Sequence, residues 1–272
     1  MPKNITDLPH ALENREELDE RLSGKRPAVF LDYDGTLTPI VDRPEDAVIS
    51  QSMRDAVSSL AGRCPVCVVS GRDRKVVQKL MGVDDLIVAG SHGFDIWSPE
   101  GGEISHNPAG ENFEETLEKA KARLAEASDS IEGALVEEKS ASVAIHYRLV
   151  AEERDRAKIK NIVDELLAEH PDELKVTPGK MVYEIQPNID WDKGKAALYL
   201  LEALGLDGEG VVPIYVGDDL TDENAFRALK DRGVGVFVGV ADDPELAGRT
   251  TAADYALDTV EEVERFLDAL AR

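Results

Sequence analysis

Short runs of apolar residues alternate with segments of helical periodicity at both ends of this 272-residue chain. The runs PAVFLD, PVCVVSG and DLIVAG occur near the beginning, and VVPIYVG and VGVFVG occur near the end. A strand that is apolar on both faces is typical of a parallel sheet with helices packed on both sides. The alternation therefore predicts a doubly wound α/β domain built around a parallel sheet.

The pattern changes in the middle of the chain. Residues 111–187 contain two amphipathic helical segments, each followed by two short runs of alternating polarity. Such alternation is typical of antiparallel strands that have one buried and one exposed face. We therefore expect a core domain over residues 1–106 and 187–272, and a compact α+β cap domain inserted over residues 107–186. Near the N-terminus the pattern predicts a helix that begins close to Leu8.

The composition argues against several functional classes. The formal net charge is −24, whereas nucleic-acid binding requires a basic surface. No apolar run approaches the roughly 20 residues of a membrane span, and the polar N-terminus lacks the apolar core of a signal peptide. We expect a monomeric cytoplasmic protein with a small-molecule partner. Cys64 and Cys67 form a C-x-x-C that leads into a strand, and we interpret them as structural, because redox motifs of this type open a helix.

Polar residues follow the apolar runs at the points where the predicted strands end. Asp32 and Asp34 follow the first run, two residues apart. On an extended chain their side chains point the same way and repel each other unless a cation lies between them. Open α/β sheets bind ligands at the carboxyl ends of their strands, so we expect a single site there. Other strand ends, and the helix start before the fourth run, contribute Ser70, Gly71, Arg72, Lys193, Asp218 and Asp219.

These residue types indicate a magnesium site that receives a phosphoryl group. Carboxylates without imidazole or thiolate suit a hard cation such as Mg²⁺, which would lie between Asp32 and Asp218 and neutralise them. Lys193 would offset the remaining charge, and Ser70 would donate a hydrogen bond to the phosphoryl group. One aspartate would attack phosphorus while the other protonates the leaving oxygen. Each of these polar residues alone has an ordinary explanation, such as a turn or a helix cap. Their occurrence together at the ends of predicted strands favours a phosphoryl-binding site.

These motifs resemble those of the haloacid dehalogenase (HAD) superfamily, and in their extended form those of the trehalose-6-phosphate phosphatases. DYDGTLTPI at residues 32–40 is similar to the first family motif, and GDDLTDENAF at 217–226 is similar to the last. SGR and WDKG lie between them. The resemblance covers nearly the whole chain and implies a HAD-type Rossmann-like core with an αββαββ cap. It also implies Mg²⁺-dependent hydrolysis of trehalose 6-phosphate to trehalose and phosphate through an aspartyl-phosphate intermediate.

The resemblance implies a role for each core residue. Asp32 would be the nucleophile, Asp34 the general acid and base, and Lys193 a catalytic residue that also binds phosphate. Asp32, the main-chain carbonyl of Asp34 and Asp218 would hold Mg²⁺. Ser70 would bind the phosphate together with Lys193, and Gly71 and Arg72 would also be substrate-binding residues. Asp219 and Asp222 would support the metal-binding carboxylates.

The resemblance also implies sugar contacts from the cap and from one core loop. Carboxylate, lysine and arginine side chains suit sugar hydroxyls, because each makes directional hydrogen bonds. In the core loop GSHGFDI, His92 would contact the substrate. The cap residues expected to do so are Glu137, Lys139, Arg148, Lys180 and Glu184.

Three other functions stay open at this stage. The chain is also similar to phosphatases for other sugar phosphates, such as sucrose phosphate or a glycosyl-phosphoglycerate. A HAD phosphomutase is disfavoured, because its last motif resembles GGND rather than the GDDLTDE found here. A non-enzymatic sugar-phosphate sensor is disfavoured because such proteins lose the nucleophile, which is present here as Asp32.

Overall fold

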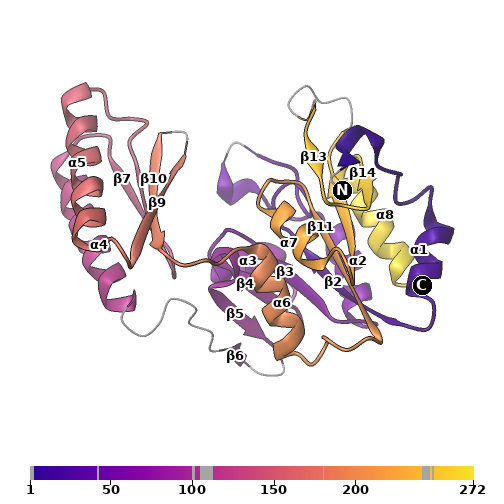
Figure 1. Ribbon diagram of the computed structural model, residues 1–272. Coiled ribbons are helices and arrows are strands. Elements are labelled where there is room, and N and C mark those ends of the chain that lie inside the picture. The colour runs from indigo at the N-terminus through magenta and orange to yellow at the C-terminus, as the bar shows by residue number, and fades with distance from the viewer. Residues whose placement is uncertain are drawn as a thin grey trace. The chain divides into compact units, whose positions relative to one another are not determined.

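The computed structural model describes residues 3–41, 43–99, 102–104, 113–179, 181–240, 246 and 248–272, with the backbone alone at 102–104, 178 and 179. The chain forms two compact units, and Figure 1 shows the elements of each. Unit 1 comprises Met1–Ile104 and Asp192–Arg272, and unit 2 comprises Ser105–Trp191. The insertion thus begins at residue 105 rather than 107 and ends at 191 rather than 186.

Unit 1 is built on an eight-stranded sheet with the order β14-β12-β11-β2-β3-β4-β5-β6. Neighbouring strands from β14 to β4 are parallel, which confirms the predicted parallel sheet. The hairpin of β5 and β6 adds an antiparallel edge beyond β4. The strands span Arg26–Leu31 (β2), Val66–Val69 (β3), Ile87–Gly90 (β4), Asp95–Ser98 (β5), Gly102–Ile104 (β6), Val211–Gly217 (β11), Val234–Val238 (β12) and Tyr255–Leu257 (β14).

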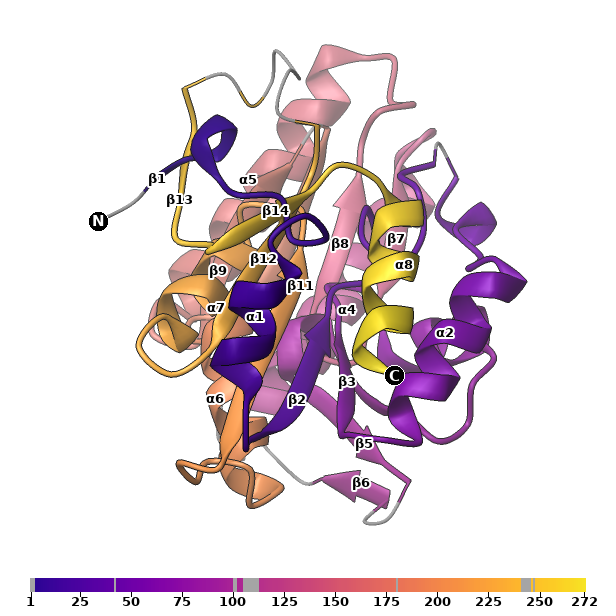
Figure 2. The same ribbon diagram turned by 90° about the vertical axis from the view of Figure 1, so that its right-hand side faces the viewer.

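Helices cover both faces of this sheet. On one face, Val29 and Val216 pack with the apolar sides of α1, α2, α3 and α8, and Figure 2 shows α1, α2 and α8 in front of the strands. On the other face, Tyr215 meets Phe226 of α7 edge to face, with 5.8 Å between the ring centroids. The helices span Arg15–Leu22 (α1), Gln51–Ala61 (α2), Arg74–Met81 (α3), Lys193–Ala203 (α6), Asp222–Leu229 (α7) and Val260–Leu270 (α8).

The first helix begins at Arg15, so the predicted start near Leu8 is wrong. Leu8 precedes Pro9 and adopts an extended conformation with φ −71° and ψ 136°. A residue before proline avoids helical angles because the proline ring collides with it. The segment before α1 instead forms β1 (Lys3–Asn4), which pairs with β13 (Thr250–Thr251), and the 3₁₀ helix η1 (Ile5–Asp7).

Unit 2 has the predicted αββαββ order. Its antiparallel sheet has the order β7-β8-β10-β9, and its buried face packs on α4 and α5. Residues beyond β10 stay attached to this unit, because Asn188 N donates to Glu173 O at 2.7 Å. No described helix of either unit is long and apolar enough to cross a membrane. The elements span Phe113–Ser130 (α4), Leu135–Glu138 (β7), Val143–His146 (β8), Glu153–Glu169 (α5), Leu174–Gly179 (β9) and Val182–Pro187 (β10).

Candidate active site

The order of strands in the unit 1 sheet reverses between β2 and β11. From β2 the chain proceeds outward through β3 and β4, and from β11 it proceeds the other way through β12 and β14. Asp32 follows β2 directly, and Asp218 follows β11 directly. Asp32 N donates to Val216 O at 2.9 Å, which fixes one strand end against the other. Ligands of open α/β sheets bind at such a reversal, so the topology brings these two aspartates to the expected place.

A buried lysine connects aspartates from two different segments. Lys193, the first residue of α6, donates from Nζ to Oδ1 of Asp32 and to Oδ1 of Asp222, both at 2.8 Å. The exposed fractions of Lys193, Asp32 and Asp222 are 3%, 5% and 0%. Buried charges are tolerated only when they are paired and hydrogen-bonded, so this network holds the three side chains in one arrangement.

Asp222 is the most completely bonded member of this network. Its Oδ1 accepts from Tyr215 Oη at 2.8 Å as well as from Lys193, and its Oδ2 accepts from Asp219 N at 3.0 Å. The side chain of Asp219 accepts a hydrogen bond at Oδ1 from the backbone N of Leu220 at 2.6 Å. Asp222 thus organises the turn before α7 and orients Lys193. Tyr215 was missed by the sequence reasoning, although its position on β11 places it on the sheet face that carries α6 and α7.

The carboxylates outnumber the cations at the centre of the site, which changes how they ionise. Burial raises the pKa of Asp32 well above its ordinary value, and Asp222 adds to this effect while Lys193 opposes it. The pKa of Asp218 is raised to about 7, chiefly by burial and secondly by the negative charge of Asp222. Burial lowers the pKa of Lys193, but Asp32 and Asp222 outweigh burial and keep that pKa above its ordinary value. The site therefore has excess negative charge and a single ammonium among the described groups within it.

The residues present fit a hard divalent cation. Carboxylate oxygens of Asp32, Asp218 and Asp222 lie within 4.8 Å of one another. Oδ1 of Asp218 is buried and has no hydrogen-bond partner in the described part of the chain, so an acceptor remains unused. Gly35 makes room for this side chain, because a Cβ there would lie 2.0 Å from Asp218 Oδ2. An all-oxygen donor set with excess negative charge is the kind that Mg²⁺ or Ca²⁺ prefers.

The side chain of Asp34 lies outside this carboxylate cluster and is held by Arg72. Nε and Nη2 of Arg72 donate to Oδ2 and Oδ1 of Asp34, each at 2.6 Å. Nη1 donates to Pro44 O at 2.6 Å, and the guanidinium lies 5.6 Å from the centroid of the Tyr33 ring. The structure therefore gives Arg72 contacts within the protein where the sequence predicted a contact with substrate.

Ser70, Gly71 and His92 lie at the ends of β3 and β4. Ser70 is buried, and its Oγ accepts from Arg72 N at 3.1 Å while its carbonyl accepts from His92 N at 2.8 Å. His92 has a left-handed φ of 57° within the 3₁₀ helix η3 (Ser91–Gly93). A Cβ at residue 71 would lie 2.7 Å from His92 Cε1, so the close approach of the imidazole requires Gly71.

A pocket of about 470 Å³ lies in unit 1 over these strand ends. It contains both Asp32 and Asp34, together with Lys193, so their side chains share one solvent-accessible space. Ser70 and Arg72 are absent from its described walls. Ile40 adds an apolar edge and is 76% exposed. The lining residues are Asp32, Asp34, Ile40, Val41, Gly71, His92, Lys193, Asp218, Asp219 and Thr221.

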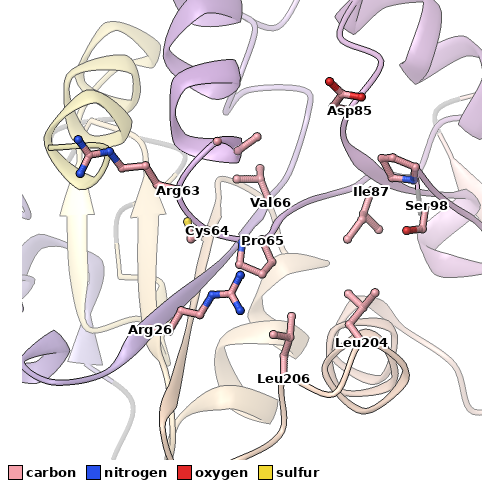
Figure 3. Close-up of a pocket in the computed structure, with 13 residues that line it drawn as sticks. Arg26, Arg63, Cys64, Pro65, Val66, Asp85, Ile87, Ser98, Leu204 and Leu206 are labelled. Carbon is pink, nitrogen blue, oxygen red and sulfur yellow. The ribbon is translucent and has the colours of Figure 1, made fainter. Parts of the chain in front are cut away.

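A second hollow of about 600 Å³ lies at the opposite edge of the same sheet, where the strands begin. Figure 3 shows Arg26 beneath Pro65, with Leu206 and Leu204 to the right of Arg26. None of the predicted site residues lines it. Cys64 lines this hollow, whereas Cys67 does not. Both cysteines are buried, and neither forms a disulfide.

In unit 2, three of the predicted sugar contacts, Glu137, Lys139 and Glu184, lie at the polar face of the sheet. Glu137 and Glu184 both lie opposite Ala144 on β8, one from each side, so the three share a face. Glu184 Oε1 accepts from Lys139 Nζ at 2.9 Å and from Ser142 Oγ at 2.7 Å. Arg148 is exposed in the turn beyond β8. Lys180 lies outside the described residues.

Two polar residues of that face were not predicted. His146 Nε2 lies 3.0 Å from Glu137 Oε2, and Ser142 contacts Glu184 as described above. The alternation of the run SASVAIH is the signal that would have found them, because Ser142, Ala144 and His146 point to the same side of the strand.

Comparison with known proteins agrees with this geometry. A family model described as trehalose-phosphatase matches residues 30–261. An uncharacterized glycosyl hydrolase of Mycobacterium tuberculosis is 43% identical over 98% of this chain, which spans only 20% of that relative. Trehalose 6-phosphate phosphatase RA3 of Zea mays is 41% identical over 97% of this chain and 74% of its own length. A solved trehalose-6-phosphate phosphatase of Aspergillus fumigatus has a TM-score of 0.66 and 26% identity, over 97% of this chain and 98% of that chain.

These matches extend over both units and all four sequence motifs. The family model alone covers more than half of the chain, and the maize relative is matched over more than two thirds of its length. The predicted resemblance is therefore confirmed: this chain belongs to the trehalose-phosphatase family.

Proposed function

We propose that this protein is a Mg²⁺-dependent phosphatase that hydrolyses trehalose 6-phosphate to trehalose and inorganic phosphate. The observation that supports this most directly is the meeting of Asp32, Asp218 and Lys193 at the strand reversal, inside a pocket that also contains Asp34. The maize and fungal relatives carry trehalose 6-phosphate phosphatase in their names. The cytoplasmic location and monomeric state expected from the sequence stay predictions.

The metal would be held by Asp32, Asp218 and the main-chain carbonyl of Asp34, with Asp219 and Asp222 supporting these ligands. Asp218 offers the buried oxygen that lacks a partner, whereas Asp222 already has bonds to both of its oxygens. When bound, Mg²⁺ supplies positive charge that allows three carboxylates and a phosphate to occupy one pocket.

The residues of the chain would each have a different role in the reaction. The Asp32 carboxylate attacks phosphorus, the bond from phosphorus to the sugar oxygen breaks, and an aspartyl phosphate forms. Asp34 protonates the departing sugar oxygen and then accepts a proton from the water that attacks the aspartyl phosphate. This second step releases inorganic phosphate and restores Asp32. Lys193 orients Asp32 through its 2.8 Å hydrogen bond and supplies positive charge for the phosphoryl oxygens.

Sugar recognition is assigned to the polar face of unit 2 and to His92. Lys139 bonds to Glu184 and His146 bonds to Glu137 on this face, and these hydrogen bonds can be exchanged for bonds to sugar hydroxyls. Arg148 and Lys180 complete the set expected from the family. Closure of unit 2 over the substrate would exclude water from the aspartyl phosphate until the sugar leaves.

The test is phosphate release from a panel of sugar phosphates in the presence of Mg²⁺. We expect kcat/KM for trehalose 6-phosphate to exceed that for glucose 6-phosphate and for sucrose 6-phosphate by about 100-fold or more. Equal values would refute the specificity but leave a general sugar phosphatase. A requirement for a sugar bisphosphate activator, with transfer of phosphate between positions, would instead identify a phosphomutase.

A further inference from the structure

We infer that Arg72 is a positioning residue for the general acid and base Asp34, rather than a ligand of the substrate phosphate. The inference rests on the proposed function for the role of Asp34. Its geometric basis is the pair of 2.6 Å hydrogen bonds that the guanidinium makes to the two oxygens of this carboxylate.

The two-point contact fixes the orientation of Asp34. A carboxylate held through both oxygens by a planar guanidinium cannot rotate without breaking two charge-assisted hydrogen bonds. The Asp34 side chain is not part of the buried cluster of Asp32, Asp218 and Asp222. Asp34 is also the more exposed partner, with 39% of its side chain accessible against 17% for Arg72. Without Arg72, this half-exposed side chain would sample several rotamers.

Arg72 is itself held by four further contacts with described residues. Its backbone N donates to Ser70 Oγ at 3.1 Å, and its carbonyl accepts from Ser91 N at 2.7 Å. Its Nη1 donates to Pro44 O at 2.6 Å, and its guanidinium lies against the Tyr33 ring. The fixed ends of β3 and β4 therefore determine where the carboxylate of Asp34 lies after β2.

The described residues that line the pocket include Asp34 but not its partner Arg72. Lys193 and Asp218 line it as well. The guanidinium therefore contacts Asp34 outside the described wall of the pocket. We expect the phosphoryl oxygens to contact Lys193, which lines the pocket, rather than Arg72.

The predicted kinetic effect is a loss of kcat with little change in KM. Misplacing a catalytic group by about 1 Å costs up to about 100-fold in rate, so we expect Arg72→Gln to lower kcat by about 10- to 100-fold. Arg72→Lys keeps the charge without the planar fork, so we expect an intermediate loss. Since Arg72 does not touch substrate, KM and the Kd of inorganic phosphate, measured by calorimetry with Mg²⁺, should change less than about twofold. Arg74→Lys is the matched control, because it alters a second Arg–Asp pair, with Asp95, two positions along the chain and outside the pocket.

A double-mutant cycle tests whether Arg72 acts through Asp34. Asp34→Asn alone should lower kcat by about 10²- to 10⁴-fold. If Arg72 acts only through Asp34, adding Arg72→Gln to Asp34→Asn should lower kcat by less than about twofold more. Additive losses, a weaker phosphate Kd or an unchanged kcat in Arg72→Gln would each overturn the proposal. Arg72→Lys replaces Arg72→Gln in the cycle if near-UV circular dichroism shows that the latter does not fold.

The cycle is run with trehalose 6-phosphate and with p-nitrophenyl phosphate, so that two failures can be told apart. A wild-type chain that hydrolyses only p-nitrophenyl phosphate would refute the sugar specificity and leave the Arg72 test intact. An active wild type with additive losses would refute the role of Arg72 alone. A wild type that is inactive on both substrates would refute the proposed function, and the role of Arg72 with it.

Discussion

The two units handle charge in opposite ways. In unit 1, Lys193, Asp32 and Asp222 are almost completely buried and bonded to one another. In unit 2, the ion pair of Lys139 and Glu184 leaves 17% and 27% of those side chains exposed on an open sheet face. A buried network is rigid and strongly coupled, because little solvent screens it, whereas a half-exposed one rearranges at small cost. The difference suits chemistry in one unit and recognition in the other.

The sharpest test of this comparison is removal of the proposed nucleophile. Asp32→Asn keeps the size of the side chain but cannot form the aspartyl phosphate. We expect kcat for trehalose 6-phosphate to fall by at least about 10⁴-fold, measured by phosphate release. The thermal midpoint without metal should not fall, because the carboxylates outnumber the one ammonium among the described groups of the site and the substitution removes one negative charge. A fully active Asp32→Asn would refute the assigned role.

Removal of the buried cation Lys193 should lower the stability more than removal of the partly exposed cation Lys139. Lys193→Met leaves Asp32 and Asp222 buried without their ammonium, so we expect a loss of about 3–5 kcal/mol of unfolding free energy in EDTA. Lys139→Met removes a part-exposed pair and should cost less than about 1 kcal/mol. Urea unfolding of the two variants makes the comparison, and equal losses would show that burial does not separate the two networks.

Mg²⁺ should stabilise unit 1 by occupying the carboxylate site. A ligand at 100 times its Kd adds about 2.7 kcal/mol to the stability of the folded state. We expect the thermal midpoint of the wild type to rise with Mg²⁺ and that of Asp218→Asn to respond much less, since its unpartnered oxygen is replaced. Glu184→Gln in unit 2 is the control and should respond like the wild type. An equal response of Asp218→Asn would place the metal elsewhere.

The metal-free protein should lose stability as the pH rises. The folded-state pKa of Asp218 is raised to about 7, above the value of about 3.9 for an unfolded aspartate. The folded state therefore binds more protons between these values, and the cost of burying the charge is absent below pH 4 and complete above pH 7. We expect a loss of up to about 4 kcal/mol across this window in EDTA. Asp218→Asn should show a smaller slope, and identical slopes would contradict this assignment.

The smallest effect is expected on the polar face of unit 2. Glu184→Gln weakens hydrogen bonds to the sugar and should raise KM for trehalose 6-phosphate about tenfold, or about 1.4 kcal/mol, with kcat within about threefold. Hydrolysis of p-nitrophenyl phosphate, which lacks the sugar, should be unchanged. Glu138→Gln is the control, because Glu138 pairs with Val143 and so belongs to the opposite face. A drop in kcat without a rise in KM would argue against a sugar contact.

The predictable part of the site consists of residues at strand ends. Asp32, Ser70 and Asp218 each follow an apolar run, and parallel strands bring their carboxyl ends to one edge. Lys193 was also predictable, because it begins the helix before β11 and Asp192 caps that helix through a 2.9 Å bond to Lys195 N. For these residues, sequence position and topology together determine their location.

The unpredictable part consists of contacts between side chains from different segments. The pairing of Arg72 with Asp34 depends on how two turns approach each other, and spacing along the chain does not specify that distance. The same holds for the bond from Tyr215 to Asp222 and for the contact of His10, ahead of α1, with Glu262 of α8, which joins residues 252 apart.

By itself, the sequence determined the parallel sheet, the αββαββ insertion and the edge at which the acidic residues gather, because burial of apolar strands and their alternation are local patterns. Only the tertiary structure decided which charges pair: Lys193 with both Asp32 and Asp222, and Arg72 with Asp34. The physical reason is that an ion pair depends on separation in space and on burial, and both are set by packing between segments far apart in the chain.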